Sequence, residues 1–290
     1  MRIAVGIATR GRAAVLGETL AEVLRQTRAA DRVIVCHVTE EDVAGLRTRF
    51  DSVEFITAPP GLPRQRNAIM DAAVDCDLLL YLDDDFLPAP EYLAVLHAVA
   101  KARPDLVVAT GVVIADGAKG PGITVAEGRA LIRQDMPVAE PHASEPAFNA
   151  YGCNMAIRLA PACAQGIRFD EALPLYAWYE DIDFSRRLGA HGAILRLPGA
   201  RGVHLGVKAG RVKGLRLGYS QVANPVYLAR KGSYPWSHAL WSAGRHLVIN
   251  LLRSPVPEPH VDRFGRLRGN LIALVDLLRG RAAPARILDL

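Results

Sequence analysis

The sequence predicts an α/β fold with a mostly parallel sheet flanked by helices, followed by a helical C-terminal extension. Two observations support this prediction. Short apolar runs alternate with helix-period segments over the first 115 residues, and two amphipathic segments occupy the C-terminal end. The 290 residues are 50% hydrophobic and 22% charged, which is typical of a globular protein and excludes wholesale disorder.

Alternation of strands and helices is expected from the N-terminus onward. The expected strands are Ile3–Ala8, Arg32–Val38, Val53–Thr57, Leu78–Leu82, Leu106–Ile114 and Ala193–Leu197, and regular structure is expected to resume at Tyr151–Leu159. The expected helices are Ala14–Arg28, Arg64–Val74, Pro90–Ala102, a segment from Glu180 to Gly192, His238–Leu252 and Arg266–Arg279. Residues 116–148 contain several Gly and Pro and little periodicity, so an irregular, substrate-facing insertion is expected there.

Composition excludes several classes of protein. No stretch of about 18 apolar residues is free of charge, and the N-terminal apolar run is too short for a signal peptide. The four cysteines have no tight pairing or zinc spacing, which argues against a disulfide framework and fits a cytoplasmic protein.

The net charge of +5 hides an asymmetry. Residues 1–195 hold 19 Lys/Arg and 26 Asp/Glu, a balance of −7, whereas residues 196–290 hold 16 and 4, a balance of +12. The basic end is suited to a phosphate-rich partner. The acidic front half argues against a nucleic-acid-binding protein, because it carries no basic patch with interleaved aromatic residues.

An acidic triplet, Asp83-Asp84-Asp85, directly follows the apolar run Leu78–Leu82. In an extended segment Asp83 and Asp85 point to the same side and Asp84 to the other. The pair could hold a Mg²⁺ or Mn²⁺ ion, because such ions prefer oxygen ligands, and Asp84 would be left for a ribose or sugar hydroxyl. The alternative is a solvated acidic loop or a helix N-cap before Pro90.

Three further segments carry candidate functional residues. Glu180-Asp181-Ile182-Asp183 opens a predicted helix, where acids suit the helix dipole, or one carboxylate serves as a general base. In Gly61–Asn67, two arginines and an asparagine open a helix, which suits phosphate binding or an ordinary capped helix with surface arginines. His204 follows a strand, and a lone histidine there is either structural or a ligand.

The order of these elements is more specific than any one of them. They read Ile7-Ala8-Thr9-Arg10, Arg66-Asn67, Asp83-Asp84-Asp85, Arg168-Phe169-Asp170-Glu171, Glu180-Asp181-Ile182-Asp183 and His204. This order resembles the family 2 glycosyltransferases with the GT-A fold over roughly residues 2–205. The resemblance implies a catalytic domain at 1–205, with a nucleotide-binding half at 1–115 and an acceptor-binding half at 116–205. Residues 206–290 would form a basic, mainly helical extension.

The resemblance also implies a reaction, the transfer of a sugar from a nucleotide-activated donor to a hydroxyl with inversion at the anomeric carbon. Asp181 resembles the catalytic base, and Glu180 would position the acceptor. No covalent protein nucleophile is needed for a single displacement.

The same resemblance assigns the donor side of the site. Thr9 and Arg10 would line the nucleotide pocket, with Arg66 near the base or the diphosphate. The triplet residues Asp83 and Asp84 would contact the nucleotide sugar. Asp85 and Asp83 would ligate Mn²⁺ or Mg²⁺, and His204 could complete the metal shell.

The chain departs from the family after its second strand, where an acidic residue often holds the nucleotide base. Cys36 and His37 stand there, so either Glu40 or Asp42 takes over or base recognition differs. A UDP-sugar is the default donor, with GDP and dTDP left open.

Two rival functions remain at this point. A nucleotidyltransferase would need a glycine-rich basic loop after the first strand, and Ala8–Arg12 is a poor version of one. A non-catalytic peripheral membrane scaffold is disfavoured because the triplet and Glu180-Asp181 are both present.

The C-terminal segments have two readings. Trp236, Trp241 and the apolar face of 238–252, with arginines nearby, suit attachment to an anionic membrane surface, such as the inner face of the cell membrane. Alternatively, these helices pack on the catalytic domain or form a homo-oligomer interface. The expected acceptor is a glycan or a lipid-linked molecule in polysaccharide or surface-glycan biosynthesis.

Overall fold

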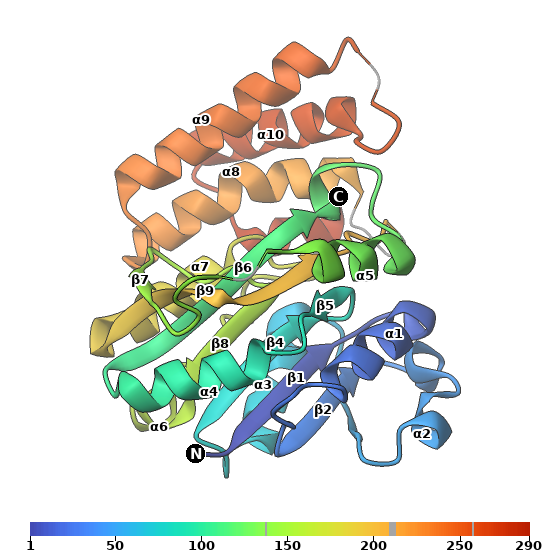
Figure 1. The fold of residues 1–290 in the computed structure, drawn as a ribbon. Coiled ribbons are helices and arrows are strands. Elements are labelled where there is room, and N and C mark those ends of the chain that lie inside the picture. Colours follow the sequence, from blue (N-terminus) through green and yellow to red (C-terminus); the bar gives the residue numbers. More distant parts are fainter. Residues whose placement is uncertain (137, 209–212, 257) are drawn as a thin grey trace. The chain divides into compact units, whose positions relative to one another are not determined.

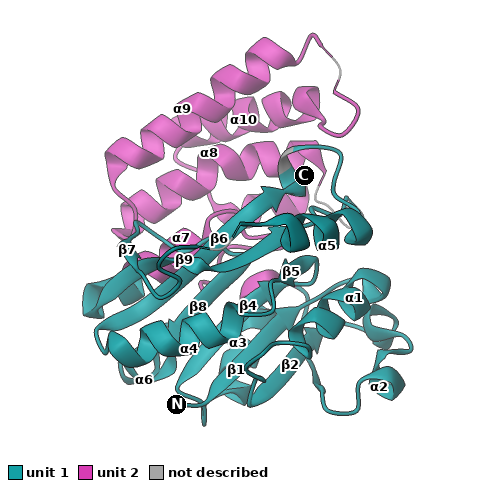
Figure 2. Cartoon of the chain, in the orientation of Figure 1, with its two compact units in different colours: residues 1–60, 64–168, 187–210 teal, residues 61–63, 169–186, 211–290 magenta. Residues whose placement is uncertain are grey.

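The computed structural model describes residues 1–136, 138–208, 213–256 and 258–290. It divides into two compact units, which Figure 2 colours separately. Unit 1 holds residues 1–60, 64–168 and 187–210, and unit 2 holds residues 61–63, 169–186 and 211–290. This division differs from the expected boundary at 205, because residues 169–186 group with the C-terminal helices.

Unit 1 is built on one sheet. Among the described residues it has nine strands in the order β3-β2-β1-β4-β8-β6-β9-β5, with β7 paired to β9 (Figure 1). Their bounds are β1 (Ile3–Ala8), β2 (Arg32–His37), β3 (Glu54–Thr57), β4 (Leu78–Asp83), β5 (Phe86–Pro88), β6 (Leu106–Asp116), β7 (Glu145–Pro146), β8 (Asn154–Arg158) and β9 (Ala193–His204).

The pairing confirms the predicted fold class. β1 runs parallel to β2 and β4, β2 runs parallel to β3, and β6 runs parallel to β9. Only part of the sheet is antiparallel: β8 lies between β4 and β6 and opposes both, and β5 and β7 oppose β9. A mostly parallel sheet places its ligand site at the carboxyl ends of the strands.

Helices of unit 1 cover both faces of this sheet, with α1 and α4 on one face and α3 on the other. The bounds in unit 1 are α1 (Ala13–Val23), α2 (Leu46–Arg49), α3 (Leu62–Ala72), α4 (Tyr92–Ala102), α5 (Val125–Gln134) and α6 (Leu159–Ala164), and α7 (Glu180–Leu188) begins in unit 2. Short 3₁₀ helices span Glu40–Val43, Gly117–Lys119, Gly189–His191 and Pro284–Asp289.

Alternation along β1 decides which helix packs where. Ile3, Val5 and Ile7 point into the core shared with α1 and α4. Gly6 points to the opposite face, where a Cβ would come within 2.4 Å of Ile69 Cγ2 on α3. The glycine therefore lets α3 approach the sheet closely.

Residues 116–148 are more ordered than expected. They contain α5, which begins with a capping box: the Thr124 hydroxyl accepts from the Glu127 amide, and the Glu127 carboxylate accepts from the Thr124 amide. This box supplies two of the hydrogen bonds that a helix start lacks. Val125, Leu131 and Ile132 also give the helix an apolar side that packs against a buried cluster of unit 1. The prediction of an irregular segment was wrong for residues 125–134.

Unit 2 contains three long helices, α8 (Gly214–Lys231), α9 (Trp236–Arg253) and α10 (Arg263–Leu278). Helices α8 and α10 approach each other closely because glycines stand where they meet. A Cβ on Gly218 of α8 would lie 2.0 Å from the Arg266 carbonyl oxygen. A Cβ on Gly269 of α10 would lie 2.1 Å from the Leu215 carbonyl oxygen. The backbones of α8 and α10 therefore touch.

Amide side chains connect the three helices inside unit 2. Asn250 Nδ2 donates to Gln221 Oε1 at 3.1 Å and to Asn270 Oδ1 at 2.9 Å. Asn270 Nδ2 in turn donates to the Gly218 carbonyl oxygen at 2.7 Å. All three amides are buried, and hydrogen bonding offsets the cost of removing them from water.

The environment of His246 in unit 2 leads us to expect that the stability of the fold depends on pH. His246 of α9 packs edge-on against Trp178, and burial, together with Arg245, Arg266 and Arg263, lowers its pKa to about 4. Because this pKa lies below the unfolded value, the neutral ring stabilises the fold above about pH 6.5, and this contribution is lost as the pH falls toward 4. The contribution at stake is at most about 3 kcal/mol.

We therefore expect urea unfolding of the wild type to lose stability between pH 7 and pH 4.5 more steeply than that of His246→Gln, which carries no titrating ring. The exposed His142→Gln variant is the control and should follow the wild type. Equal pH profiles for the wild type and His246→Gln would contradict the prediction.

Candidate active site

The acidic triplet stands at the carboxyl edge of the unit 1 sheet. β4 ends at Asp83, which pairs with Ala8 at the end of β1, so Thr9 and the triplet leave the sheet side by side. The chain then turns into β5, and Phe86 of β5 pairs with His204 at the end of β9. This antiparallel pairing brings residues far apart in sequence to one place.

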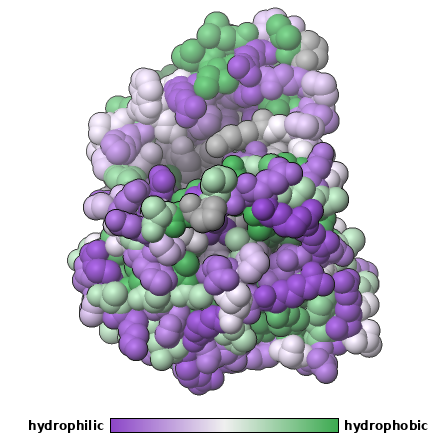
Figure 3. All heavy atoms as spheres, in the orientation of Figure 1, coloured by the Kyte–Doolittle hydropathy of each residue, from purple (hydrophilic) through white to green (hydrophobic). Residues whose placement is uncertain are grey.

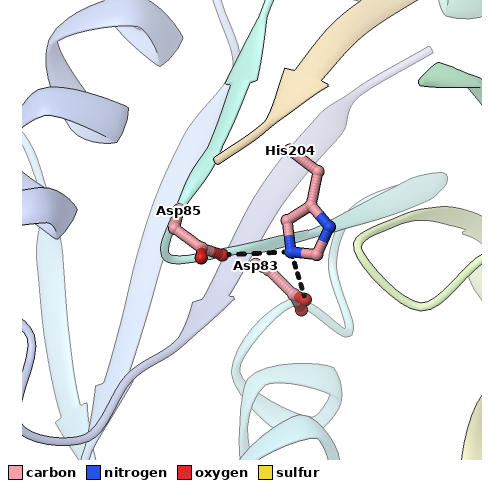
Figure 4. A group of neighbouring side chains, drawn as sticks. All are labelled: Asp83, Asp85 and His204. Carbon is pink, nitrogen blue, oxygen red and sulfur yellow. Dashed lines mark ion pairs between the residues drawn. The ribbon is translucent and has the colours of Figure 1, made fainter. Parts of the chain in front are cut away.

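Asp83, Asp85 and His204, the three predicted metal ligands, are brought together. One ligand atom from each lies within 4.8 Å of the others (Figure 4). His204 Nε2 is 3.3 Å from Asp85 Oδ1 and 3.8 Å from Asp83 Oδ2. Asp83 and Asp85 point to the same side, as the i, i+2 spacing predicts.

These residues fit a divalent cation. Asp85 Oδ1 is buried and accepts no hydrogen bond from the described part of the chain. The other oxygen, Oδ2, accepts from the Val207 amide at 2.7 Å, which fixes the carboxylate. Two carboxylates and an imidazole nitrogen form a donor set that Mn²⁺ accepts.

Asp116, at the end of β6, orients the histidine. Its Oδ1 lies 2.9 Å from His204 Nδ1, so the imidazole turns Nε2 toward the two acids. The same carboxylate accepts from the Ala118 amide at 3.0 Å and from the Tyr151 hydroxyl at 3.3 Å. A carboxylate behind a ligating imidazole is a common support of metal sites.

The acidic residues around His204 also raise the pKa of its imidazole. Burial disfavours the imidazolium, but the hydrogen bond to Asp116 and the contact with Asp85 outweigh burial and raise the His204 pKa to about 10. A proton on Nε2 therefore balances the acids, and a cation bound by the same three residues would displace it.

Asp84 points away from the metal ligands. Its Oδ2 accepts from the Thr9 hydroxyl at 2.7 Å, and its Oδ1 accepts from Arg12 Nη1 at 2.9 Å. Burial raises the pKa of Asp84, and Arg12 opposes the rise. Asp84 is therefore hydrogen-bonded to other residues of the protein, Thr9 and Arg12. The predicted contacts of Thr9 and Asp84 with a nucleotide sugar stay a prediction. The contact of Arg12 with the acidic triplet was not predicted. The only signal for it in the sequence is its position two residues after Arg10.

Arg66 of α3 lies in the interior, with 2% of its surface exposed. Its guanidinium donates to the Gly152 carbonyl oxygen at 2.7 Å and lies 3.3 Å from Asp83 Oδ1. Arg66 is therefore next to the candidate metal site, close to where a diphosphate would need positive charge. Arg10, by contrast, is exposed on the turn after β1.

The turn after β2 shows what the two candidate base-binding acids do. Asp42 is buried and accepts from the amides of Gly11, Val38 and Thr39 at 2.7, 2.9 and 2.9 Å, so it ties the turn after β1 to the turn after β2. Glu40 is exposed and pairs with Arg47. Asp42 therefore has a structural role in joining the two turns, and the group that recognises the nucleotide base stays a prediction.

The predicted catalytic acids lie in unit 2, at the start of α7. Glu180 and Asp183 are buried, whereas Asp181 is partly exposed. Asp183 accepts from Lys231 Nζ at 2.8 Å and from the Ser233 hydroxyl at 2.6 Å. Of the three acids, Asp181 thus combines access to solvent with a place in the first turn. Its predicted position opposite Asp83–Asp85 stays a prediction.

The loop before Asp181 is held in a strained conformation. Leu175, Ala177 and Tyr179 have φ angles of 58°, 53° and 75°, in the left-handed region that residues other than glycine rarely adopt. Each costs on the order of 1–3 kcal/mol, and such strain is concentrated at functional sites. Contacts with α8 and α9 hold the loop: Asn224 donates to the Trp178 carbonyl oxygen at 2.9 Å, and the Tyr179 hydroxyl bonds to Ser242.

Comparison with known proteins bears on this site. Residues 4–126 match the family model described as Glycosyl transferase family 2. The predicted family resemblance is confirmed. The glycosyltransferase domain match includes Thr9, Arg66, the acidic triplet and Asp116, while His204 and Asp181 lie beyond it. No curated protein matches the chain significantly in sequence.

Solved structures show the same fold at low sequence identity. TarS 1-349 from S. aureus is 14% identical with a TM-score of 0.60, covering 99% of this chain and 82% of that one. The mannosyltransferase PcManGT from Pyrobaculum calidifontis, in complex with GDP-Man and Mn²⁺, is 17% identical with a TM-score of 0.56, covering 99% and 85%. GalNAc-T7 with UDP, GalNAc and Mn²⁺ is 16% identical with a TM-score of 0.55, covering 70% and 44%. These likenesses confirm a glycosyltransferase fold of GT-A type.

The support of His204 by Asp116 gives a prediction about metal affinity. Asp116→Asn keeps the shape but removes the charge behind the imidazole, so we expect Mn²⁺ to bind about 10- to 100-fold more weakly, measured by calorimetry on the protein without donor. Asp105→Asn, an exposed acid just before the opposite end of β6, is the matched control and should bind Mn²⁺ like the wild type. Unchanged affinity in Asp116→Asn would refute the role of Asp116.

Proposed function

We propose that the protein is a metal-dependent, inverting glycosyltransferase that transfers a sugar from a nucleoside-diphosphate donor to an acceptor hydroxyl. The observation that carries this proposal is the convergence of Asp83, Asp85 and His204 at the carboxyl end of β4, within a chain whose residues 4–126 match the family 2 glycosyltransferases.

The residues of unit 1 prepare a place for the diphosphate. Asp83, Asp85 and His204 would hold the cation, which supplies positive charge to the leaving nucleoside diphosphate when it is bound. Arg66 adds a fixed cation beside Asp83, and Asp116 keeps the imidazole in position. Because these groups are set before substrate arrives, they stabilise developing negative charge without rearranging.

Asp181 is the proposed base. A base must reach the acceptor proton, which requires access to the substrate, and Asp181 is the partly exposed acid of its helix turn. The carboxylate of Asp183 accepts hydrogen bonds from Lys231 and Ser233. Glu180, which is buried, would position the acceptor. One base and one displacement give inversion at the anomeric carbon.

The proposed donor is a UDP-sugar, with GDP and dTDP as alternatives. Structures similar to this chain contain UDP-GlcNAc or UDP in TarS and GDP-Man in PcManGT, so the fold accommodates both bases. The acceptor would be a glycan or a lipid-linked molecule, in polysaccharide or surface-glycan biosynthesis in the cytoplasm. A homo-oligomer and the absence of a nucleic-acid partner are parts of the same proposal.

A metal requirement is the first test. We expect hydrolysis of UDP-sugars to be fastest with Mn²⁺, slower with Mg²⁺ and abolished by EDTA, because the set contains a nitrogen donor and Mg²⁺ prefers oxygen. In His204→Asn the advantage of Mn²⁺ over Mg²⁺ should shrink. Turnover that persists at full rate in EDTA would exclude the proposed metal site.

The base is tested separately. Asp181→Asn should lower the transfer rate by about 10²–10⁴-fold, because general base catalysis contributes on that order. Binding of the donor with Mn²⁺, measured by calorimetry, should remain, since Asp181 is not assigned to the donor. A variant that keeps its rate, or that loses donor binding together with its rate, would remove Asp181 from this role.

A further inference from the structure

Helix α9 presents its apolar side chains outward. Trp241 is 74% exposed and Leu252 is 71% exposed, and Leu240, Val248 and Leu251 are more than half exposed. The spacing from 241 to 248 and 252 places these residues on one face. Figure 3 shows apolar side chains gathered over the C-terminal half of this helix. The residues that α9 buries are Ala239, Ser242 and Asn250.

Helix α10 has the same inverted pattern. Its exposed apolar residues are Phe264, Leu271, Val275 and Leu278, at intervals of seven, four and three, and Leu278 is 90% exposed. Its buried residues are Gly269, Asn270, Ala273 and Asp276. Ile272, Leu274 and Leu277 of α10 pack partly against the interior of unit 2. An ordinary surface helix of a soluble protein exposes mainly polar residues on its outer side, whereas α9 and α10 expose large apolar ones there.

The packing between these helices fits this inversion. Gly214 and Gly218 on α8, and Gly265 and Gly269 on α10, follow a small-xxx-small spacing, and Gly218 and Gly269 bring the two backbones together. The amides of Asn250 and Asn270 form hydrogen bonds between helices. Because small residues and hydrogen bonds between amides make these contacts, large apolar side chains of α9 and α10 remain on the outer surface.

Arginines predominate among the charges around the apolar face, although Glu258 lies 3.6 Å from Arg253 Nη1 and Asp262 is exposed at the start of α10. Arg245 and Arg253 of α9 and Arg268 and Arg279 at α10 are exposed. Over residues 236–253, all described, α9 has no acidic residue, and the Asp276 carboxylate of α10 is buried, accepting from the Tyr219 hydroxyl. A face with apolar and aromatic side chains bordered by arginines has the composition that anionic lipid headgroups attract.

We propose that the apolar face of α9 and α10 binds an anionic lipid membrane, with both helices lying on its surface. None of the described helices is long and apolar enough to cross a bilayer, so the attachment is along the surface. A second copy of the chain is the less suitable occupant, because a symmetric contact through this face would bring its arginines against one another. Trp236 and Trp241 would lie at the headgroup level, where tryptophan is favoured.

Vesicle flotation of the full chain tests this proposal. The probes are phosphatidylcholine vesicles with and without 30 mol% phosphatidylglycerol, at low and high salt, without donor or metal. We expect binding to the anionic vesicles only, and weaker binding at high salt. The double variant Trp241→Ser/Leu252→Ser should lose flotation, and Val74→Ser, which alters an exposed apolar residue of unit 1, should keep it.

The arginines are tested by Arg245→Gln, Arg253→Gln and Arg268→Gln, each expected to weaken the anionic vesicle affinity about fivefold at low salt. Circular dichroism checks that every variant is folded. Equal flotation with neutral and anionic vesicles, or none with either, overturns the proposal. So does a dimer in light scattering that Trp241→Ser/Leu252→Ser converts to a monomer without any flotation by the wild type.

This proposal is independent of the proposed reaction. Flotation without donor or metal can succeed while hydrolysis fails, and the reverse also holds. The two results therefore distinguish a wrong assignment of this face from a wrong assignment of the chemistry.

Discussion

Three adjacent carboxylates at the end of a buried strand are the constraint on which unit 1 depends. Like charges at this spacing repel, and burial increases the cost. The chain gives each acid its own partner: Arg66 lies beside Asp83, Thr9 and Arg12 bind Asp84, and the Val207 amide and His204 face Asp85. The partners of each acid come from a different part of the chain, so the triplet draws together α3, the turn after β1 and the end of β9.

Unit 2 has a comparable centre at Asp183. Its carboxylate is completely buried, and Lys231 and Ser233 at the end of α8 bind both oxygens. Removing Lys231 would take the compensating charge away from this buried carboxylate, which is costly. The ion pair therefore fixes the first turn of α7 to α8, and with it the backbone that carries Asp181. Lys231 also contacts Asp170, which extends this connection to the segment before the strained loop.

The N-terminal fold and the acidic cluster could be predicted because their signals are local. An apolar run such as Leu78–Leu82 marks a buried strand, and the triplet marks where it ends. Asp116 could not be predicted, because its role depends on β6 and β9 running in parallel to the same edge. Helix α8 was not predicted: it contains Pro225, and it is buried on almost all sides from residue 218 to 229, including the polar Gln221 and Asn224, so its sequence does not separate into an apolar and a polar side. The role of Gly218 and Gly269 in bringing α8 and α10 together can be recognised only in the packed structure.

The left-handed turn at Leu175, Ala177 and Tyr179 has a consequence for the boundaries of the working enzyme. Such a backbone persists only while its surroundings impose it, and here α8 and α9 impose it. A protein shortened after β9 would still contain every residue assigned to the chemistry. Its loop would relax, and the acid that follows would lose its fixed place. The shortest fragment that keeps this loop in place is therefore set by α8 and α9 and extends well past the last residue proposed for the chemistry.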